Sequence, residues 1–332
     1  MIKMLMFDLK NSERDFLKSI DTSDYEITYY TESLNKETKL SLKQCDETAI
    51  ISVFITSSVG AEVLNKFKNL RIIVTRSICY EHIDIEECRK RNIAVINVTD
   101  YAREAISQYV IGLVFAMSRN IVLANNDVKN RIHNFEKYES ENINKLSIGV
   151  IGTGSVGSAV CELAHKLGMK VYANDIVKNQ KIADYTEYLS FNDLLRKSDI
   201  VTLHIPYNKE FCKMISYKEL EMMKEGSYLI NTCEYKLIDS LALYKALKRN
   251  KIKSAAIDVI LEDNDILSQK KSKRTYDDLE NFIILKKLIQ SDKVIVTPRI
   301  SYDTKECIKT ILETNFRDIK DYFVGRKTNR VV

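Results

Sequence analysis

Tryptophan is absent from the 332-residue chain, which has only two prolines and nine glycines. Such scarcity makes each glycine and proline informative about where the backbone turns. Long apolar runs are also missing, since no stretch approaches the ~20 uncharged apolar residues that span a bilayer. The apolar run at residues 1–8 is too short for a signal peptide and predicts a strand. We therefore expect a protein without a membrane partner.

Neither charge sign is in large excess, because 51 Lys and Arg stand against 46 Asp and Glu, and the two signs are interspersed. The resulting net charge of +5 gives no argument for a nucleic-acid partner. A composition of 45% hydrophobic and 29% charged residues is that of a soluble globular protein. The seven cysteines are odd in number and lack a paired metal-ligand spacing. Free thiols in a reducing cytoplasm are the simplest account, so we expect a cytoplasmic protein without a metal centre.

An apolar run at 148–151 leads directly into a glycine-rich turn and a predicted helix at 158–167. This order of strand, turn and helix is typical of a dinucleotide-binding unit. Gly152 would permit a tight turn, Gly154 the approach of a pyrophosphate, and Gly157 close packing of helix on strand. The helix N-terminus adds unpaired N–H groups and a positive dipole end. The predicted phosphate-binding residues are Gly152, Gly154, Ser155, Val156 and Gly157.

A second predicted strand, at 170–175, ends on the carboxylate of Asp175, eighteen residues after Gly157. An acid in this place hydrogen-bonds the adenosine ribose hydroxyls. Its charge would repel a 2′-phosphate, so the sequence favours NAD over NADP. The alternative is a glycine-rich turn in another kind of α/β domain.

The first hundred residues alternate short apolar runs with amphipathic segments, which argues for a parallel α/β domain. Strands are predicted at 3–7, 26–30, 49–53, 71–74 and 94–97, and helices at 12–20, 38–43, 60–66 and 85–91. A long helix is predicted from 102 to about 131 by apolar residues at helical spacing. It would connect two domains or pack against a second subunit, and an ordinary buried helix explains it equally well.

The remaining segments continue the same alternation. Further strands are predicted at 199–206, 227–232, 254–259 and 294–298, and helices at 190–197, from Asp239 as cap to about 248, and at 304–323. Asn250 would take the left-handed position that ends the second of these helices. The last helix would return to the first domain, and the charged stretch 262–274 would form a solvated loop.

Together these segments resemble the D-isomer-specific 2-hydroxyacid dehydrogenases over nearly the whole chain, with the D-lactate dehydrogenases, including those tied to vancomycin resistance, as the closest subgroup. Both prolines fall inside the matching motifs. These motifs are 75–77 with 82–84, 149–157, 201–206, 229–232, 255–259 and 297–298.

The resemblance implies two Rossmann-like domains, each a parallel sheet flanked by helices, with a cleft between them for the nicotinamide and a 2-keto acid. Residues 1–100 plus 303–332 would form a flavodoxin-like substrate domain, and 101–302 the NAD-binding domain. It also implies a homodimer formed through the NAD-binding domain. Further cofactor-binding positions implied by the family motifs are His204, Ile205, Pro206, Thr232 and Asp258.

Catalysis in the family uses an arginine that clamps the substrate carboxylate, a histidine that donates the proton, and a glutamate that holds the histidine. The motifs place Glu234 at the arginine position and Arg299 at the histidine position. Asp263 falls at the glutamate position, with Glu262 beside it. All three positions are changed. Asp263 keeps the carboxylate of the family glutamate, whereas Glu234 and Arg299 are chemically different from the arginine and the histidine that they replace.

The family's glycines are kept at the cofactor site and replaced at the substrate site. The cofactor glycines are present, whereas the family's Ala-Gly pair that binds the carboxylate is replaced by Ile78 and Cys79, and the glycine after the arginine by Tyr235. Bulky side chains here would close space where backbone approaches a ligand. Cys79 and Cys233 both map to the cleft, either as a redox pair or as small buried hydrophobic residues.

Three functions remain open. The first is a pseudoenzyme that binds NAD(H), with a salt bridge between Glu234 and Arg299 and Asp263 alongside. The second is an active oxidoreductase on a cationic or neutral carbonyl compound, with His204, Tyr235 or Cys233 as the proton donor. The third is an ordinary D-2-hydroxyacid dehydrogenase in which these motifs are misaligned.

Overall fold

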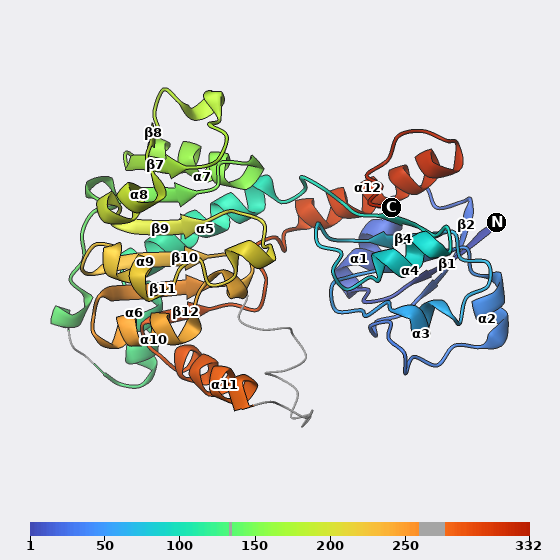
Figure 1. The fold of residues 1–332 in the computed structure, drawn as a ribbon, viewed down its shortest axis with the longest axis horizontal. Coiled ribbons are helices and arrows are strands. Elements are labelled where there is room, and N and C mark those ends of the chain that lie inside the picture. The colour runs from blue at the N-terminus through green and yellow to red at the C-terminus, as the bar shows by residue number, and fades with distance from the viewer. Residues whose placement is uncertain (133–134, 259–275) are drawn as a thin grey trace. The chain divides into compact units, whose positions relative to one another are not determined.

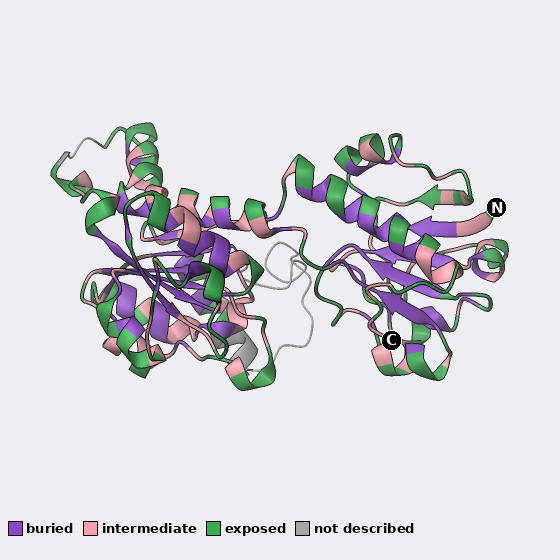
Figure 2. Cartoon of the chain, turned by 90° about the horizontal axis from the view of Figure 1, so that it is seen from above, coloured by how far each residue is buried: buried purple, intermediate pink, exposed green. Residues whose placement is uncertain are grey.

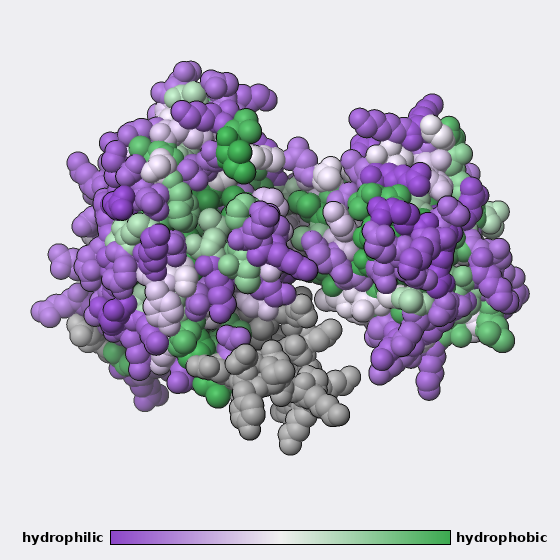
Figure 3. Space-filling model, in the orientation of Figure 1, coloured by the Kyte–Doolittle hydropathy of each residue, from purple (hydrophilic) through white to green (hydrophobic). Residues whose placement is uncertain are grey.

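The computed structural model describes residues 1–132, 135–258 and 276–332 of the chain. It divides into two compact units, drawn in Figure 1. Unit 1 comprises Met1–Tyr101 and Asp303–Val332, and unit 2 comprises Ala102–Tyr302. Within each unit, buried residues fill most of the strands and exposed residues line the outer sides of the helices (Figure 2). Hydrophilic side chains cover most of the visible surface (Figure 3).

Unit 1 contains a five-stranded sheet in which every neighbouring pair is parallel. Its strands are β1 (Ile2–Met6), β2 (Tyr25–Tyr29), β3 (Ile50–Val53), β4 (Ile72–Thr75) and β5 (Ala94–Ile96). The order β2-β1-β3-β4-β5 is that of flavodoxin-like sheets, with the change of direction between β1 and β3. Strands β3, β4 and β5 are buried throughout, which explains why Ser52 and Thr75 are their only polar residues.

Helices cover the sheet of unit 1. They are α1 (Asn11–Leu17), α2 (Leu42–Glu47), α3 (Ala61–Leu64), α4 (Ile85–Lys90) and α12 (Lys305–Phe323). Helix α12 returns from the C-terminal part of the chain and contacts α1 and β4. The predicted helix at 38–43 is wrong, because Ser41 caps the helix by accepting a hydrogen bond from the Gln44 N–H, so that α2 begins at Leu42.

Unit 2 contains a seven-stranded parallel sheet in the order β12-β11-β10-β9-β6-β7-β8. Its strands are β6 (Ser147–Ile151), β7 (Lys170–Asn174), β8 (Glu187–Tyr188), β9 (Ile200–Leu203), β10 (Ser227–Asn231), β11 (Ile252–Ile257) and β12 (Val294–Val296). The strand order reverses between β6 and β9. In open sheets of this kind, ligands bind outside the carboxyl ends of the strands at that point.

Two hydrophobic cores lie on the two faces of this sheet. The helices of unit 2 are α5 (Arg103–Ser118), α6 (Ile121–Lys129), α7 (Ser155–Lys166), α8 (Phe191–Lys197), α9 (Tyr217–Met222), α10 (Ser240–Lys248) and α11 (Tyr276–Ile289). Helices α5 and α7 share one core with the sheet. Helices α8, α9, α10 and α11 share the other. Helix α11 was not predicted from the sequence.

The predicted long helix after residue 102 is divided into α5 and α6, which are bent by 58°. Asn120 separates them in the left-handed region, with φ of 53°, where asparagine is one of the few tolerated residues. Among the described residues no single helix has the length and apolar character to cross a membrane, and the bent pair passes that test only when its two helices are joined. Helix α7 begins at Ser155, three residues before the predicted start, directly at the glycine-rich turn.

Candidate functional site

The glycine-rich turn connects β6 to α7 at the point where the strand order reverses. Gly152 has φ of +89°, and a Cβ there would lie 2.4 Å from the His204 carbonyl oxygen. A Cβ on Gly157 would lie 1.9 Å from the carbonyl oxygen of Gly152. At Gly154 a Cβ would meet nothing within 4 Å. The first two positions therefore require glycine for packing, while Gly154 leaves open space beside the N-terminus of α7, as a phosphate-binding turn requires.

Asp175 follows β7 directly and faces the glycine-rich turn. Its Oδ2 atom accepts hydrogen bonds from the Thr153 backbone N–H at 2.5 Å and from the Thr153 hydroxyl at 3.0 Å. Oδ1 accepts from the Val177 N–H at 3.2 Å. Desolvation acts to raise the pKa of Asp175, but these hydrogen bonds outweigh it and lower the pKa, so the carboxylate is ionised at neutral pH. Ile176 and Val177 beside it are 93% and 74% exposed, an apolar surface next to the carboxylate.

His204 lies at the end of β9, against the glycine-rich turn. Its backbone N–H donates to the Ile151 carbonyl at 2.7 Å. Its Nε2 atom lies 2.9 Å from the Thr202 hydroxyl. Burial lowers the pKa of His204 to about 3, so the ring is neutral at neutral pH and does not hold the extra proton that a general acid delivers.

The turn after β10 is organised by the buried side chain of Asn231, which the sequence analysis did not single out. Its Oδ1 accepts from the Cys233 N–H at 2.9 Å, and its Nδ2 donates to the Glu234 carbonyl at 3.0 Å. Cys233 Sγ donates to the Leu203 carbonyl at 3.3 Å. The hydroxyl of Thr232, in contrast, is buried without a hydrogen-bond partner among the described residues. Buried polar groups are normally paired, so this hydroxyl is available to a bound molecule.

Asp258, after β11, is fully buried and holds the loop that follows β12. Oδ1 accepts from the Thr297 hydroxyl at 2.6 Å and the Ile300 N–H at 3.0 Å, and Oδ2 accepts from the Ser301 N–H at 2.8 Å. The Arg299 N–H donates to the Asp258 carbonyl at 2.5 Å. Both carboxylate oxygens are thus used inside the protein, and they fix the backbone on which Arg299 stands.

Glu234 and Arg299 meet at this edge of the sheet. Arg299 Nη2 lies 3.3 Å from Glu234 Oε2, and the side chains of Arg299 and Glu234 are 25% and 24% exposed. Arg299 Nε is buried without a hydrogen-bond partner among the described residues. The Arg299 backbone has φ of 53°, a left-handed conformation that is uncommon for non-glycine residues and in which Asn, Asp and His are enriched. The salt bridge predicted from the sequence is therefore present, whereas Asp263 and Glu262 lie outside the described residues.

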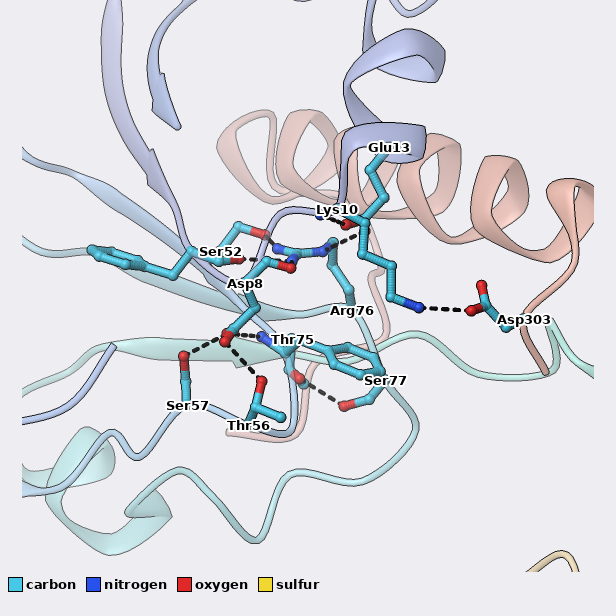
Figure 4. Close-up of polar contacts among 12 residues, drawn as sticks. Asp8, Lys10, Glu13, Ser52, Thr56, Ser57, Thr75, Arg76, Ser77 and Asp303 are labelled. Atoms are coloured by element: carbon cyan, nitrogen blue, oxygen red, sulfur yellow. Dashed lines mark hydrogen bonds and ion pairs between the residues drawn. The ribbon is translucent and has the colours of Figure 1, made fainter. Parts of the chain in front are cut away.

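Unit 1 has its own polar cluster at the carboxyl ends of β1, β3 and β4, where its strand order reverses (Figure 4). The Asp8 carboxylate accepts from the Thr56 hydroxyl at 2.7 Å, the Ser57 hydroxyl at 2.5 Å and the Phe54 N–H at 3.0 Å. Both carboxylate oxygens of Asp8 therefore have a donor from the loop after β3. This end of the sheet is closed by the chain's own hydrogen bonds.

Arg76 is the cation of this cluster whose side chain is fully buried, at 1% exposed. Its Nε donates to Glu13 at 3.0 Å, Nη1 to the Ser52 hydroxyl at 2.8 Å, and Nη2 to the Phe7 and Asp8 carbonyls (Figure 4). The guanidinium thus joins β1, β3 and α1. The sequence analysis placed Arg76 in a family motif without assigning it a role.

The loop after β4 carries the residues that replace the family's Ala-Gly pair. Ile78 is 46% exposed, and Cys79 is also exposed. The Ser77 hydroxyl donates to the Cys79 carbonyl at 2.6 Å, and Asn97 Nδ2 donates to the Ile78 carbonyl at 2.8 Å. Cys79 belongs to unit 1 and Cys233 to unit 2, so a redox pair between them stays a prediction.

Comparison with known proteins decides the family. The family model described as D-isomer specific 2-hydroxyacid dehydrogenase, NAD binding domain, matches residues 111–301. A D-specific alpha-keto acid dehydrogenase of Enterococcus faecium is 31% identical over 82% of each chain. The chain belongs to the D-isomer specific 2-hydroxyacid dehydrogenase family.

Solved structures of the same family agree with the fold of this 2-hydroxyacid dehydrogenase homologue. D-lactate dehydrogenase from Escherichia coli, solved without ligand, has a TM-score of 0.86 at 22% identity over the whole of both chains. D-lactate dehydrogenase from Aquifex aeolicus, solved with NAD and lactic acid, has a TM-score of 0.81 at 28% identity over 97% of this chain and 96% of that one. The predicted two-domain Rossmann-like fold is confirmed.

NAD is the cofactor of this family member, as the sequence predicted, because unit 2 is the family's NAD-binding domain. The residues present fit the dinucleotide. The open space over Gly154 can hold a phosphate, and the ionised Asp175 can accept hydrogen bonds from a ribose diol. The Thr232 hydroxyl, which has no hydrogen-bond partner among the described residues, can bond to the bound cofactor.

Substitution of Gly157 by alanine is expected to abolish measurable NADH binding. The new methyl would lie 1.9 Å from the Gly152 carbonyl oxygen, so the turn must open where the pyrophosphate binds. Titration of NADH fluorescence measures the effect. Gly112→Ala, in α5, is the matched control, because a Cβ there meets nothing within 4 Å and alanine favours a helix. NADH affinity of Gly157→Ala within threefold of wild type would contradict the expectation.

Proposed function

We propose that this chain is an NAD(H)-binding member of the family whose substrate half is rebuilt, and that it does not reduce ordinary 2-keto acids at the usual rates of such enzymes. The observation that carries the proposal is the ion pair between Glu234 and Arg299, two residues at the family's arginine and histidine positions. Asp263 would occupy the third position. Under this proposal the protein is a pseudoenzyme that acts as a sensor, scaffold or regulatory subunit.

Both side chains of the pair work against 2-keto acid reduction. Glu234 presents a negative charge where the substrate carboxylate should be bound, and it pairs with Arg299 at 3.3 Å. Arginine remains protonated at any working pH, so Arg299 cannot serve as the general acid. The absence of a general acid alone typically lowers a rate by about 10²–10⁴.

The cofactor-binding roles follow the geometry of unit 2. The turn of Gly152, Gly154, Ser155, Val156 and Gly157 would hold the pyrophosphate at the N-terminus of α7, and Asp175 the adenosine ribose. When bound, NAD(H) supplies or accepts a hydride. The side chains proposed to line the nicotinamide half are His204, Ile205, Pro206 and Thr232, while Asp258 acts through the loop that it holds.

The alternative is an active oxidoreductase, either on a D-2-hydroxy acid or on an unusual carbonyl compound. One observation favours the unusual substrate. Arg299 pairs with Glu234 through Nη2, while its buried Nε has no hydrogen-bond partner among the described residues. An amine-bearing carbonyl compound would satisfy Glu234 with its ammonium group and leave Arg299 to stabilise the carbonyl oxygen. The proton donor would then be Tyr235 or Cys233, since His204 is neutral.

Two measurements on the full-length wild-type chain test the proposal. NADH binding is measured by fluorescence titration, and NADH oxidation is followed with pyruvate, an aromatic 2-keto acid and an amine-bearing 2-keto acid. We expect NADH to bind and the first two substrates to be turned over at least about 10²-fold more slowly than by a D-lactate dehydrogenase. Turnover of pyruvate at an ordinary rate would refute the proposal, and turnover of the amine-bearing compound alone would establish the alternative.

We also propose that the chain forms a homodimer through unit 2 and resides in the cytoplasm. Exposed apolar side chains gather on α6 and just beyond it: Ile121, Val122, Val128 and Ile132 are 54%, 38%, 59% and 46% exposed. A second copy of the chain would cover them. None of the seven cysteines, all of which lie among the described residues, forms a disulfide, as suits a reducing compartment. Sedimentation of the purified chain tests the dimer, and a monomer at micromolar concentration would contradict it.

A further inference from the structure

A chain of hydrogen bonds encloses Thr153, the residue between the first two glycines of the turn. The Asn179 N–H donates to the Tyr188 hydroxyl at 2.8 Å, and that hydroxyl donates to Thr153 Oγ1 at 3.0 Å. The Thr153 hydroxyl in turn donates to Asp175 Oδ2 at 3.0 Å. Asn179 Nδ2 closes the ring on the Thr153 carbonyl at 3.1 Å. The three bonds that run from the Asn179 N–H through the two hydroxyls therefore point in one direction, toward the Asp175 carboxylate, and such chains strengthen each bond in turn.

Thr153 is fully committed to this ring. It is 3% exposed, and its N–H, its hydroxyl and its carbonyl each have a partner in it. Tyr188 comes from β8 at the edge of the sheet, and Asn179 from the connection between β7 and β8. The ring thus fastens the edge of the sheet to a turn that otherwise consists largely of glycine, the most flexible residue.

The orientation of the Asp175 carboxylate depends on the same ring. Oδ2 is held by two donors from Thr153, whereas Oδ1 accepts the longer bond from the Val177 N–H at 3.2 Å and is the oxygen left for the ribose hydroxyls. A fixed negative charge accepts a ribose diol without reorganisation and repels a 2′-phosphate at the same point. A carboxylate free to rotate would lose part of both effects.

We propose that Tyr188 and Asn179 are positioning residues that hold Thr153 and Asp175 in the geometry that selects NAD(H) over NADP(H). Neither side chain needs to contact the cofactor. Tyr188 acts through the Thr153 hydroxyl, and Asn179 through the Tyr188 hydroxyl and the Thr153 carbonyl. A substitution at Tyr188 or Asn179 should therefore weaken the preference for NAD(H) over NADP(H), although it changes no residue that binds the cofactor.

Tyr188→Phe tests the proposal, because it removes one hydroxyl and keeps the aromatic ring. The NADH dissociation constant is expected to rise about three- to tenfold, the usual effect of one hydrogen bond. NADPH affinity, measured by competition against NADH, is expected to stay constant or to increase. Tyr185→Phe is the matched control, because the Tyr185 ring stacks on His165 at 4.5 Å outside the hydrogen-bonded ring, and this variant should leave both affinities unchanged.

A second variant separates positioning from folding. Thr153→Val removes the hydroxyl that Tyr188 reaches, so Tyr188→Phe should have a clearly smaller effect on NADH affinity in the Thr153→Val background, where it removes only the acceptor of the Asn179 N–H. Thr153→Ser keeps a hydroxyl and should restore the response to Tyr188→Phe. Unchanged affinities in Tyr188→Phe, an equal loss for NADH and NADPH, or fully additive effects in the double variant would each overturn the proposal.

Discussion

The double substitution Glu234→Arg with Arg299→His is expected to raise NADH-dependent reduction of pyruvate by at least about 10²-fold over the wild-type chain. The change restores a cation for the substrate carboxylate and a side chain that can donate a proton at neutral pH. Both gains act on the same step, so the rate constant for turnover, and not only substrate affinity, should increase. Initial rates of NADH oxidation over a range of pyruvate concentrations measure both quantities.

The backbone of unit 2 already suits this reversal. The Asn231 side chain donates to the backbone carbonyl of Glu234, and Asp258 accepts from the backbone N–H groups of Arg299 and Ile300. These hydrogen bonds do not involve the two side chains that would be changed. Position 299 has φ of 53°, where histidine is better tolerated than arginine. We therefore expect the double variant to fold and to bind NADH as tightly as the wild type.

The single variants are the controls for the reversal. Glu234→Arg alone would place two arginines side by side, and Arg299→His alone would leave Glu234 facing the substrate carboxylate. Each is expected to remain close to the wild-type rate, so the gain should be strongly non-additive. A double variant that binds NADH normally but reduces pyruvate no faster than the wild type would contradict the assignment of these two positions.

The sequence predicted best those features whose partners are close along the chain. Asp239 caps α10 through the Leu241 and Ala242 N–H groups, and Asn250 ends that helix with φ of 60°, both as expected. The Glu234 and Arg299 pair is 65 residues apart and was predicted in another way. The resemblance to the family places both residues at positions that converge in its active site, and the charges there are exchanged in sign.

The features that the sequence did not predict depend on distant or weak signals. The bend at Asn120 rests on one residue inside a continuous apolar pattern, which by itself favours an unbroken helix. The hydrogen-bonded ring around Thr153 requires Tyr188, 35 residues away on a two-residue edge strand, where no periodicity is readable. Arg76 stands next to a buried apolar strand, and its partner Glu13 lies 63 residues earlier.

Substitution of Arg76 by methionine is expected to lower the free energy of unfolding by about 3–5 kcal/mol, the usual effect of removing one partner of a buried ion pair. Glu13 is 5% exposed and would remain as a buried, uncompensated charge. The Ser52 hydroxyl and the Phe7 carbonyl would lose a donor at the same time. Urea unfolding followed by circular dichroism measures the loss.

Arg91→Met is the matched control, because Arg91 pairs with Glu87 one helical turn away at 29% and 20% exposure. A pair this close to solvent contributes at most about 1 kcal/mol. Hydrogen exchange localises the effect, since Arg76→Met should increase exchange of the amides in β1, β3 and β4. A loss below about 1 kcal/mol in Arg76→Met, equal to that of Arg91→Met, would contradict the prediction.

A second substitution separates the contribution of the Arg76–Glu13 charge pair to stability from that of the other contacts of the Arg76 side chain. Adding Glu13→Met to Arg76→Met removes the stranded carboxylate and fills the space with two apolar side chains. Replacement of a whole buried pair by apolar residues is often close to neutral, so the double variant should recover most of the stability that Arg76→Met loses. If it recovers none, the carbonyls and the hydroxyl around the guanidinium, and not its pairing with Glu13, account for the stability of this end of the sheet.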